Sequence, residues 1–491
     1  MTSDKDRRLI VVSNRAPYSF RKIGDKVQPV RSIGGLITAL EPAIVARKGA
    51  WIAWGASERA RRLKSSIELP PDKPSYTFHP VPLSPDEVSD YYYGFSNSVL
   101  WPLCHYFTGN LDVQIPERRA YARVNSRFAD LVVQTARQDD FIWVQDYQLG
   151  LVPGMVRQKL PDARIGFFWH IPFPDVNVFS ILPGARGFIE AMLGADRIGF
   201  HVPNYAENFL ITVRTLTSHE VDRDNGIVRF KGRQVEVGSW PISVDFKAIE
   251  NRASLVSNQK KAQTIREGVS AERIILGIDR LDYTKGILER LHAIDRFFLK
   301  HPKFRRKVSF IQVAAPSRSQ VGSYRDLKEK IDRVVGNING KYAQLGWTPV
   351  HYFYKGFGFE EVLHLYMASD IALITPLIDG MNLVAKEYVS ARRDNTGALI
   401  LSERTGAARE LREAIFVNPY DVDGTSDAIT YTLRMSRREQ RQRMTALRNR
   451  VKNWDIFRWT DAFLSGQPAA FEDRRCESLD LFSTPLMPGR R

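Results

Sequence analysis

Cysteine is nearly absent from the sequence, which holds only Cys104 and Cys476 among 491 residues. Two cysteines cannot build the disulfide framework of a small secreted domain or a cysteine-rich zinc site. No apolar run approaches the length of a membrane span, and the opening residues MTSDKDRR are not followed by the apolar segment of a secretory signal. We therefore expect a cytoplasmic protein with no membrane partner.

Acidic residues in a metal-binding spacing are also scarce. The two Asp-x-Asp pairs are Asp222/Asp224 and Asp421/Asp423, and neither directly follows a strand-like run. The nine histidines show no i, i+4 pairing. We interpret these aspartates as turn residues and expect a reaction that needs no metal ion and no other cofactor.

Positive charge is in excess, with 71 Lys and Arg against 55 Asp and Glu, a formal net charge of +16. Such an excess raises nucleic acid or a phosphorylated small molecule as a partner. Part of it lies in MSRREQRQRMTALRNRVKNW, where the periodicity predicts a helix with Met444, Leu447 and Val451 on its buried face. The sequence has no helix-turn-helix, zinc-finger or RNA-recognition signature, so we expect phosphorylated substrates and no nucleic acid.

The 491 residues, 43% of them apolar, are enough for two or three domains. Short β-rich runs alternate with helical stretches in both halves, which is the rhythm of parallel α/β sheets. These runs occupy residues 9–13, 51–54, 141–144, 165–168 and 197–200, and then 274–278, 308–313, 350–354, 370–375, 398–402 and 414–417. The expected fold class is α/β, with two doubly wound, Rossmann-like domains facing across a deep cleft.

The expected boundary between the domains lies in GSWPISVDF, residues 238–246, after a predicted hairpin that turns at Asp224-Asn225-Gly226. We expect one domain over residues 1–240 and a second over 241–465, whose last helix returns to the first domain. Residues 466–491 form a basic tail that we expect to be disordered.

In the first half, several candidate residues follow strand-like runs, where sheets of this type bind ligands. Gly34-Gly35 opens a helical pattern and suits a phosphate, although a GG pair is more often a plain turn. His170 stands in a loop stiffened by two prolines, Arg15 follows the first run, and Asp146 is placed to accept hydrogen bonds from sugar hydroxyls. Each of these residues has an equally simple structural interpretation when it is taken alone.

The second half supplies the cations and a further carboxylate. Arg280 and Lys285 stand five residues apart in GIDRLDYTKGI, and two fixed cations are what a departing diphosphate requires. Arg318 follows the next run and suits a second phosphate. In TPLIDGMNLVAKEYV, Asp379 lies in a loop and Glu387 lies in the helix that follows, where we expect it to accept from a ribose diol.

Several longer motifs together resemble one family. They are VSNRAP, GGL, YYGFSNSVLWP, HIPFP, DRLDYTKG, INGKYAQLGWTP, TPLIDGMNLVAKEYV and VNPYD, spread between about residues 8 and 463. The chain is similar to the trehalose-6-phosphate synthases, the retaining GT-B glycosyltransferases of family 20. Motifs this long over most of the chain are a specific signal.

The resemblance implies transfer of glucose from a nucleotide-glucose, with UDP-glucose the expected donor, to glucose 6-phosphate. The implied donor site contains Gly34, Gly35, Arg280, Lys285, Phe357, Leu383, Val384, Ala385, Lys386 and Glu387, with His170 and Asp379 at the transferred glucose. The implied acceptor site contains Arg15, Tyr92, Trp101, Asp146 and Arg318. The implied catalytic residues are Arg280, Lys285, His170 and Asp379. The substrates are the expected partners, and a homo-oligomer is expected.

Three positions depart from the family's pattern: Trp169 replaces a leucine, Ile378 an arginine, and Arg404 an aromatic residue. Trp169 and Ile378 are expected to reshape the sugar pocket. They leave open a sister enzyme such as glucosylglycerol-phosphate synthase, which uses ADP-glucose and glycerol 3-phosphate. A non-catalytic regulator that binds sugar phosphates is the third reading, which the complete set of charged motif residues disfavours.

Overall fold

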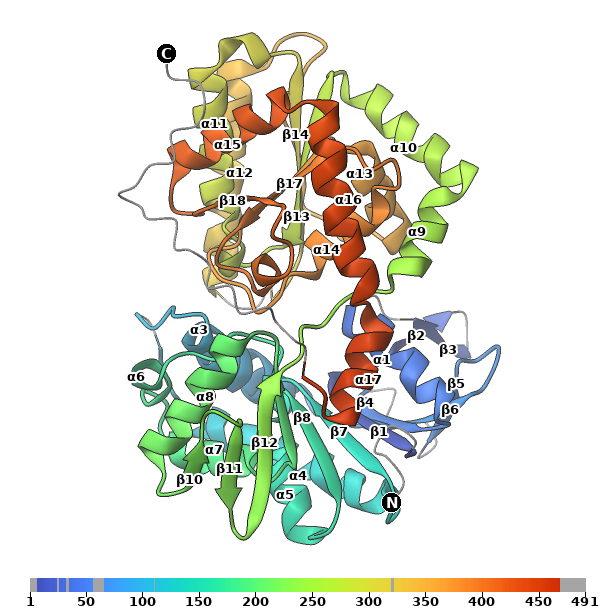
Figure 1. Ribbon diagram of the computed structural model, residues 1–491, viewed down its shortest axis with the longest axis vertical. Helices are drawn as coiled ribbons and strands as arrows, with labels where there is room; N and C mark the ends of the chain where they lie inside the picture. Colours follow the sequence, from blue (N-terminus) through green and yellow to red (C-terminus); the bar gives the residue numbers. More distant parts are fainter. Residues whose placement is uncertain are drawn as a thin grey trace.

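Two sheets, one from each half of the chain, organise the computed structural model, which describes residues 7–23, 26–31, 35–55, 66–109, 111–318 and 322–468. Figure 1 shows them as two lobes, the first blue to green and the second yellow to orange. The first sheet contains β1 (Leu9–Arg15), β4 (Ala50–Trp54), β5 (Ile67–Leu69), β6 (Tyr76–Val81), β7 (Phe141–Gln145), β8 (Arg164–Phe168), β9 (Arg197–Phe200), β10 (Glu220–Asp222), β11 (Ile227–Phe230) and β12 (Arg233–Ser239). Its strand order is β10-β11-β12-β9-β8-β7-β1-β4-β6-β5.

The second sheet has six strands, all of them parallel. It contains β13 (Arg273–Arg280), β14 (Val308–Ala315), β15 (Val350–Phe353), β16 (Ile371–Ile374), β17 (Ala398–Ser402) and β18 (Ile415–Val417). The order is β15-β14-β13-β16-β17-β18. Each predicted run coincides with one of these strands or one of the first sheet, because strands covered on both faces are almost continuously apolar.

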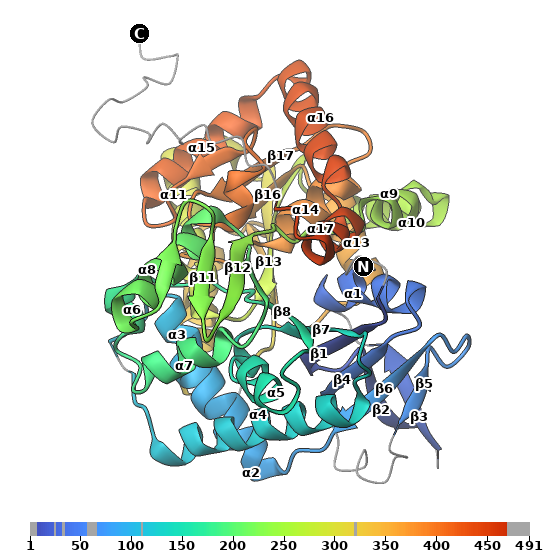
Figure 2. The same cartoon turned by 60° about the horizontal axis from the view of Figure 1, so that its bottom comes forward.

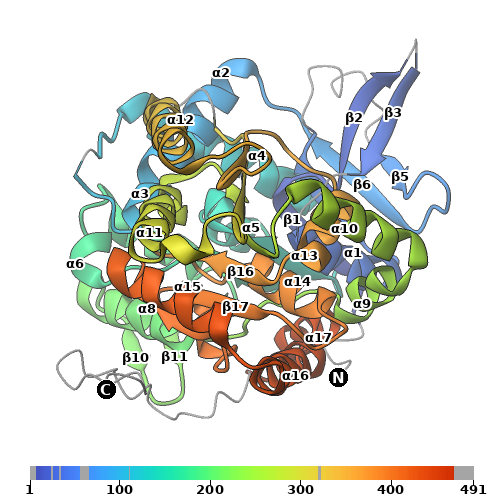
Figure 3. The same ribbon diagram turned by 90° about the horizontal axis from the view of Figure 1, so that it is seen from above.

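Helices cover both faces of each sheet, as in doubly wound folds. Those of the first lobe are α1 (Gly35–Ala46), α2 (Pro85–Glu87), η3 (Val88–Leu100), α3 (Trp101–Cys104), α4 (Ile115–Thr135), η4 (Tyr147–Leu149), α5 (Val152–Lys159), α6 (Val176–Phe179), α7 (Ala185–Met192) and α8 (Pro203–Leu216). Those of the second are α9 (Phe246–Ser254), α10 (Val256–Val269), η5 (Tyr283–Lys285), α11 (Ile287–Lys300), η6 (Pro302–Phe304), α12 (Gly322–Tyr342), α13 (Phe359–Ala368), α14 (Leu383–Ala391), η7 (Gly406–Arg409), α15 (Val422–Arg434) and α16 (Arg437–Asn453). Seen from above, α11, α12 and α15 lie on one side of the second sheet, and α10, α13 and α14 lie on the other (Figure 3).

The last helix, α17 (Ile456–Ser465), lies beside α1 of the first lobe (Figures 1 and 2). Its Trp459 and Phe463 pack on Trp143 of β7, with ring centroids 5.1 and 4.7 Å apart. Arg197 of β9 donates to the carbonyl of Phe463 at 2.6 Å. The chain therefore crosses between the lobes twice, once at residues 240–244 and once before α17.

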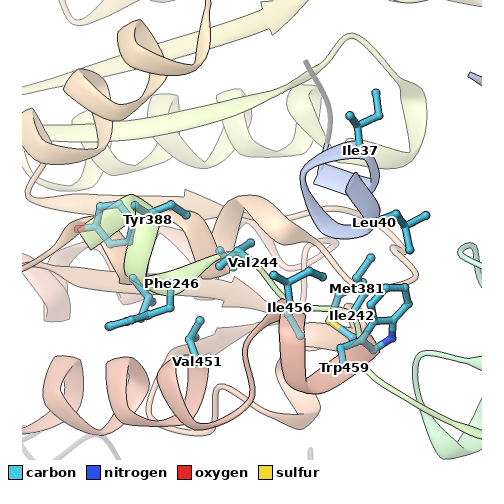
Figure 4. Close-up of a cluster of buried hydrophobic side chains, with 14 of the residues drawn as sticks. Ile37, Leu40, Ile242, Val244, Phe246, Met381, Tyr388, Val451, Ile456 and Trp459 are labelled. Atoms are coloured by element: carbon cyan, nitrogen blue, oxygen red, sulfur yellow. The ribbon is translucent and has the colours of Figure 1, made fainter. Parts of the chain in front are cut away.

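Side chains from the second half of the chain hold the first crossing by donating hydrogen bonds to its main-chain carbonyls. The carbonyls of Trp240, Pro241 and Ile242 accept hydrogen bonds, respectively, from the side chains of Trp459 (3.0 Å), Trp454 (2.7 Å) and Lys386 (2.8 Å). Apolar side chains from the crossing, α1, α14, α16 and α17 pack together around it (Figure 4). The predicted face of α16 is confirmed, since Met444, Leu447 and Val451 are all buried.

Strands β5 and β6 of the first sheet, a separate hairpin and a π-helix were not predicted from the sequence. The strands β2 (Tyr18–Ile23) and β3 (Lys26–Arg31) form a separate antiparallel hairpin. Residues Val88–Leu100 form a π-helix, η3, an element often found at functional sites. Among the described residues, no helix has the length and apolar character needed to cross a membrane. Of the basic tail predicted for residues 466–491, all but residues 466–468 lies outside the described residues.

Candidate active site

The candidate site is centred on the indole ring of Trp101, which follows directly after η3. The guanidinium carbon of Arg318 lies 4.0 Å from the ring centroid, and that of Arg280 lies 5.5 Å from it. Cations over an indole face are attracted by its quadrupole. Trp101 belongs to the first lobe, whereas Arg280 ends β13 and Arg318 follows β14 in the second lobe, so this ring is a point where the lobes meet.

Arg15, at the end of β1, joins this group through Tyr92. Its guanidinium donates to the Tyr92 hydroxyl at 2.9 Å. Burial raises the pKa of Tyr92, but Arg15, Arg318 and Arg280 outweigh burial and hold it below the usual 10. The positive charge of three guanidinium groups thus acts on one hydroxyl, and such a field suits an anion such as a phosphate.

Arg318 is the most enclosed of the three arginines. Its Nη1 donates to Asp282 at 2.9 Å and to the Tyr324 hydroxyl at 2.6 Å, and its Nη2 donates across the lobes to Tyr147 at 3.3 Å. The residue adopts φ 48°, a left-handed conformation that a non-glycine residue rarely takes. Its Nε is buried and has no partner within the described part of the chain, which leaves a donor for an oxygen ligand.

The π-helix presents Tyr92 and Trp101 to the site. Asn97 donates to the carbonyl of Tyr92 at 2.6 Å and Ser98 donates to the carbonyl of Tyr93 at 2.8 Å, both five residues back. Asn97 also accepts from the hydroxyl of Tyr147, the residue that contacts Arg318. The wide helical turn is therefore tied directly to the arginine cluster.

Asp146 and His170 follow β7 and β8, which are neighbours in the sheet. Asp146 accepts main-chain hydrogen bonds from Tyr147 (2.9 Å) and His170 (3.1 Å). Burial raises the pKa of Asp146 to about 6, although those bonds, Arg280 and Arg318 all oppose the rise. Burial lowers the pKa of His170 well below 6.5, so the ring is neutral; its Nε2 lies 2.9 Å from Oε1 of Gln145, and Nδ1 is then an acceptor.

Lys285 and Asp379 form an ion pair, with Nζ and Oδ2 2.6 Å apart. The two residues come from neighbouring strands, because η5 follows β13 and the Asp379 loop follows β16. Burial raises the pKa of Asp379, but Lys285 and the amide of Asn382 bring it below the usual value. The carboxylate is therefore ionised and holds the ammonium group.

The Asp379 loop also fits tightly against the first lobe. A Cβ at Gly380 would lie 2.5 Å from the carbonyl oxygen of His170, so only glycine fits there. Asn382, at φ 79°, caps α14 by accepting from the N–H of Ala385 at 3.1 Å. The first N–H groups of α14, those of Leu383 and Val384, have no intrahelical acceptor and suit an anion.

Lys386 corrects one expectation from the sequence. Its ammonium is 1% exposed and is bonded to Glu410 at 2.5 Å and to the carbonyl of Ile242 at 2.8 Å. Helical periodicity turns this side chain toward the crossing between the lobes, so its main chain alone stays a candidate for donor contact. Glu387 is half-buried, accepts from the Tyr366 hydroxyl at 2.7 Å, and has a pKa raised by burial to about 6.

The remaining predicted donor residues are Gly34, Gly35 and Phe357. Gly35 is the first residue of α1, and Gly34 lies outside the described residues. Phe357 follows β15, packs edge-on against Phe353 with centroids 5.7 Å apart, and lies under the ammonium of Lys355 at 4.6 Å. Together with Ile265 and other side chains, it lines a cavity of about 230 Å³ in the second lobe.

Sequence reasoning missed Asp282, Tyr147 and Tyr324, which hold Arg318. Asp282 was visible within DRLDYTKG, and Tyr147 follows the predicted Asp146, but nothing in the sequence pairs either residue with Arg318. The expected effect of Trp169 on the sugar pocket is not a direct contact: its ring is fully buried among core aromatics such as Phe173 and Phe188.

Of the Asp-x-Asp pairs, which were predicted to be turn residues, the first stands at the turn of the hairpin and the second at the start of a helix. Asp222 accepts from the main chain and the side chain of Asn225, and Asp421 caps α15 by accepting from Gly424 at 2.8 Å. Within the described ranges, no three His, Cys, Asp or Glu side chains are grouped so that they could hold a metal ion.

Comparison with known proteins extends these observations. The profile of glycosyltransferase family 20 matches residues 7–467. A trehalose-6-phosphate synthase of Mycobacterium sp. (strain JLS) is 44% identical over 472 residues, which cover 94% of this chain and 96% of the relative.

Two solved structures have the same fold. An α,α-trehalose-phosphate synthase (UDP-forming) from Burkholderia xenovorans in complex with glucose-6-phosphate superposes with a TM-score of 0.85 at 33% identity, covering 94% of this chain and 99% of that one. An E. coli structure bound with UDP-2-fluoro glucose gives a TM-score of 0.85 at 34% identity, covering 94% and 98%. The chain has the two-lobed α/β fold of these enzymes, and it belongs to glycosyltransferase family 20.

Proposed function

We propose that the chain is a retaining glycosyltransferase that transfers glucose from a nucleotide-glucose, expected to be UDP-glucose, to glucose 6-phosphate, giving α,α-trehalose 6-phosphate. One observation carries this proposal: Arg280 and Arg318 lie against the same Trp101 ring. Two anionic substrates bound to these cations would lie side by side where the lobes meet. The similarity to trehalose-6-phosphate synthases, which extends over nearly the whole chain, supports the proposal.

The acceptor is assigned to the first lobe with one residue from the second. Arg15, Tyr92 and Arg318 are assigned to its phosphate, because Arg15 bonds to the Tyr92 hydroxyl and the charge of Arg318 also acts on that hydroxyl. Trp101 is assigned to the acceptor site as the aromatic ring that packs against the guanidinium of Arg318. Asp146 supplies a carboxylate for sugar hydroxyls, which is the stronger kind of acceptor once it is ionised.

The donor is assigned mainly to the second lobe. Arg280, Lys285 and the start of α14 at Leu383, Val384 and Ala385 hold the diphosphate, Glu387 the ribose, and Phe357 the base. Gly35, the first residue of α1, is assigned to the diphosphate from the first lobe. The assignment of Gly34 stays a prediction, because this residue lies outside the described part of the chain. His170 and Asp379 lie at the transferred glucose, where the loops of the two lobes touch at Gly380.

The chemical step follows from these positions. As the bond between the anomeric carbon and the diphosphate oxygen breaks, negative charge develops on the diphosphate, and Arg280 and Lys285 stabilise it. The departing oxygen takes the proton of the acceptor hydroxyl, whose oxygen bonds to the same face of the sugar, so configuration is retained. Asp379 is bound to Lys285 and Asn382 and orients the cation rather than attacking the sugar.

The cations also make the proposed reaction independent of a divalent metal ion. Arg280 and Lys285 supply the positive charge that Mg²⁺ supplies elsewhere. We further propose that the enzyme acts in the cytoplasm, which suits a sequence with two cysteines, and that it is a homo-oligomer. Light scattering of the purified protein measures the oligomeric state.

The test is an assay of the purified protein with UDP-, GDP- and ADP-glucose, each combined with glucose 6-phosphate and with glycerol 3-phosphate, with and without a chelator. The proposal expects turnover with glucose 6-phosphate, highest with UDP-glucose and unchanged by the chelator. Turnover with glycerol 3-phosphate and ADP-glucose alone would establish the sister enzyme. Binding of both ligands without turnover would establish a regulator, and turnover restored only by Mg²⁺ would overturn metal independence.

A further inference from the structure

The carboxylate of Asp282 lies between the two groups of cations and has no role in the assignments above. It is fully buried, with 0% of its surface exposed, and it stands between Arg280 and Lys285 in the sequence. A buried charge of this kind is costly unless every lone pair has a partner. Its two oxygens have separate sets of partners.

Oδ1 holds the turn that carries Lys285. It accepts from the main-chain N–H of Thr284 at 3.0 Å and from the Thr284 hydroxyl at 2.9 Å. The N–H of Lys285 returns to the carbonyl of Asp282 at 3.1 Å. These three bonds fix η5 and thereby the start of the Lys285 side chain, whose ammonium reaches Asp379.

Oδ2 holds Arg318. It accepts from Nη1 of Arg318 at 2.9 Å and from the Tyr324 hydroxyl at 3.3 Å. The same guanidinium reaches Tyr147 of the first lobe. Burial raises the pKa of Asp282, but Arg318, Arg280 and Lys285 lower it below the usual value, so the group is ionised.

We propose that Asp282 is a positioning residue that couples the binding of the two substrates, because one oxygen orients Arg318 for the acceptor phosphate and the other orients the Lys285 turn for the donor diphosphate. The inference rests on the proposed function, which assigns those two cations. An acceptor phosphate that orders Arg318 also orders Asp282 and the turn behind it. The donor then binds to a site whose ordering cost is already met.

The sign of the coupling decides between this role and simple electrostatics. Two anionic ligands bound close together repel each other, so each should weaken the other if nothing connects their sites. When the first ligand orders the shared carboxylate, the lower ordering cost for the second ligand offsets that repulsion and makes the coupling favourable. Coupling between binding sites is reciprocal, so each ligand must change the affinity of the other by the same factor.

The experiment uses UDP and glucose 6-phosphate, a pair that binds without reacting. Calorimetry measures the Kd of UDP with and without saturating glucose 6-phosphate, and the reverse. For the wild type we expect each ligand to lower the Kd of the other at least about fivefold. In Asp282→Asn, which keeps the shape and one oxygen acceptor, we expect the factor to fall to about one or below, whatever the separate affinities become.

Two further variants each remove a partner from one oxygen of the Asp282 carboxylate. Thr284→Val removes the hydroxyl that donates to Oδ1. It should weaken the binding of UDP more than the binding of glucose 6-phosphate. Tyr324→Phe removes the hydroxyl that donates to Oδ2. It should weaken the binding of glucose 6-phosphate more than the binding of UDP. If Asp282→Asn does not fold, these variants carry the test, since both should also lower the coupling factor.

The matched control is Asp455→Asn, another aspartate that caps a helix, α17, through the N–H groups of Phe457 and Arg458. It should keep the wild-type coupling factor. A wild type that binds both ligands independently, or an Asp282→Asn variant with weaker binding but unchanged coupling, would overturn the inference and leave the proposed function standing. A wild type that binds neither ligand would overturn the proposed function and the inference with it.

Discussion

Individual side chains of the candidate site are held in place by partners of opposite charge. Lys285 lies 2.6 Å from Asp379, and Arg318 lies 2.9 Å from Asp282. Preorganised cations stabilise a developing charge at no cost of reorientation during the reaction. The sequence predicted the cations, because they follow strands in recognisable motifs, but it did not predict the pairings, because each pair joins residues far apart in the chain.

Lys285→Ala tests the role of one cation. It should lower kcat by about 10² to 10³, because it removes stabilisation of the leaving diphosphate in the transition state. The matched control is Lys300→Ala, which removes a lysine whose partners, Asp423 and Asp427, lie on the surface. Steady-state kinetics of both variants decide the matter: a kcat for Lys285→Ala within about threefold of the control would remove Lys285 from the mechanism.

Asp146 should give the enzyme an acid limb in its pH profile. Its pKa is raised to about 6 by burial, so as the pH falls through 6 the carboxylate gains a proton and stops accepting from the sugar hydroxyls. At saturating donor, kcat/KM for the acceptor should therefore fall below about pH 6. The acceptor phosphate itself titrates near this pH.

The variant Asp146→Asn separates the two titrations. It keeps the titration of the substrate phosphate and loses that of the carboxylate. On a logarithmic plot, the acid limb should approach a slope of two in the wild type and one in the variant. Equal slopes in the two proteins would show that Asp146 does not titrate in this range or does not contact the acceptor.

At the scale of elements, apolar periodicity predicted the parallel strands that are buried on both faces, because such a strand leaves a continuous apolar run. It did not predict β5 and β6 at the edge of the first sheet, where several side chains are partly exposed. It did not predict η3. The five-residue spacing of Asn97 to Tyr92 and Ser98 to Tyr93 stabilises that helix through side chains whose partners become clear only in the fold. The loop after β16 was placed correctly, but its contact with the His170 loop needs both lobes.

Gly380→Ala tests that contact between loops. The new methyl group would lie 2.5 Å from the His170 carbonyl, so one loop must move and shift Asp379 or His170 at the transferred glucose. We expect kcat/KM for the nucleotide-glucose to fall at least about tenfold, since a small displacement of positioning groups is costly. The control is Gly336→Ala, at an open position of α12, which should leave kinetics unchanged and add about 0.5 to 1 kcal/mol of stability. Unchanged kinetics in both variants would contradict the predicted role of the contact.

For the whole molecule, the relative position of the two lobes is set by the two crossings of the chain. The candidate site, which contains side chains of both lobes, depends on that position. Three consecutive carbonyls, from Trp240 to Ile242, accept side-chain hydrogen bonds, and α17 packs on the first lobe. Composition and periodicity predicted two domains and a linker near this point. The bonds that fix the linker come from Lys386, Trp454 and Trp459, residues at least 140 positions away, and no local pattern reveals them.

The central claim is that the two lobes bring a nucleotide-glucose and a sugar phosphate together on the same face of the transferred glucose. Proton NMR of the reaction of UDP-glucose with glucose 6-phosphate tests it most directly, because the anomeric couplings report the configuration of the new bond. We expect an α,α-linked disaccharide phosphate, formed with release of UDP in the presence of a chelator. A β-linked product, or hydrolysis of UDP-glucose without transfer, would contradict it.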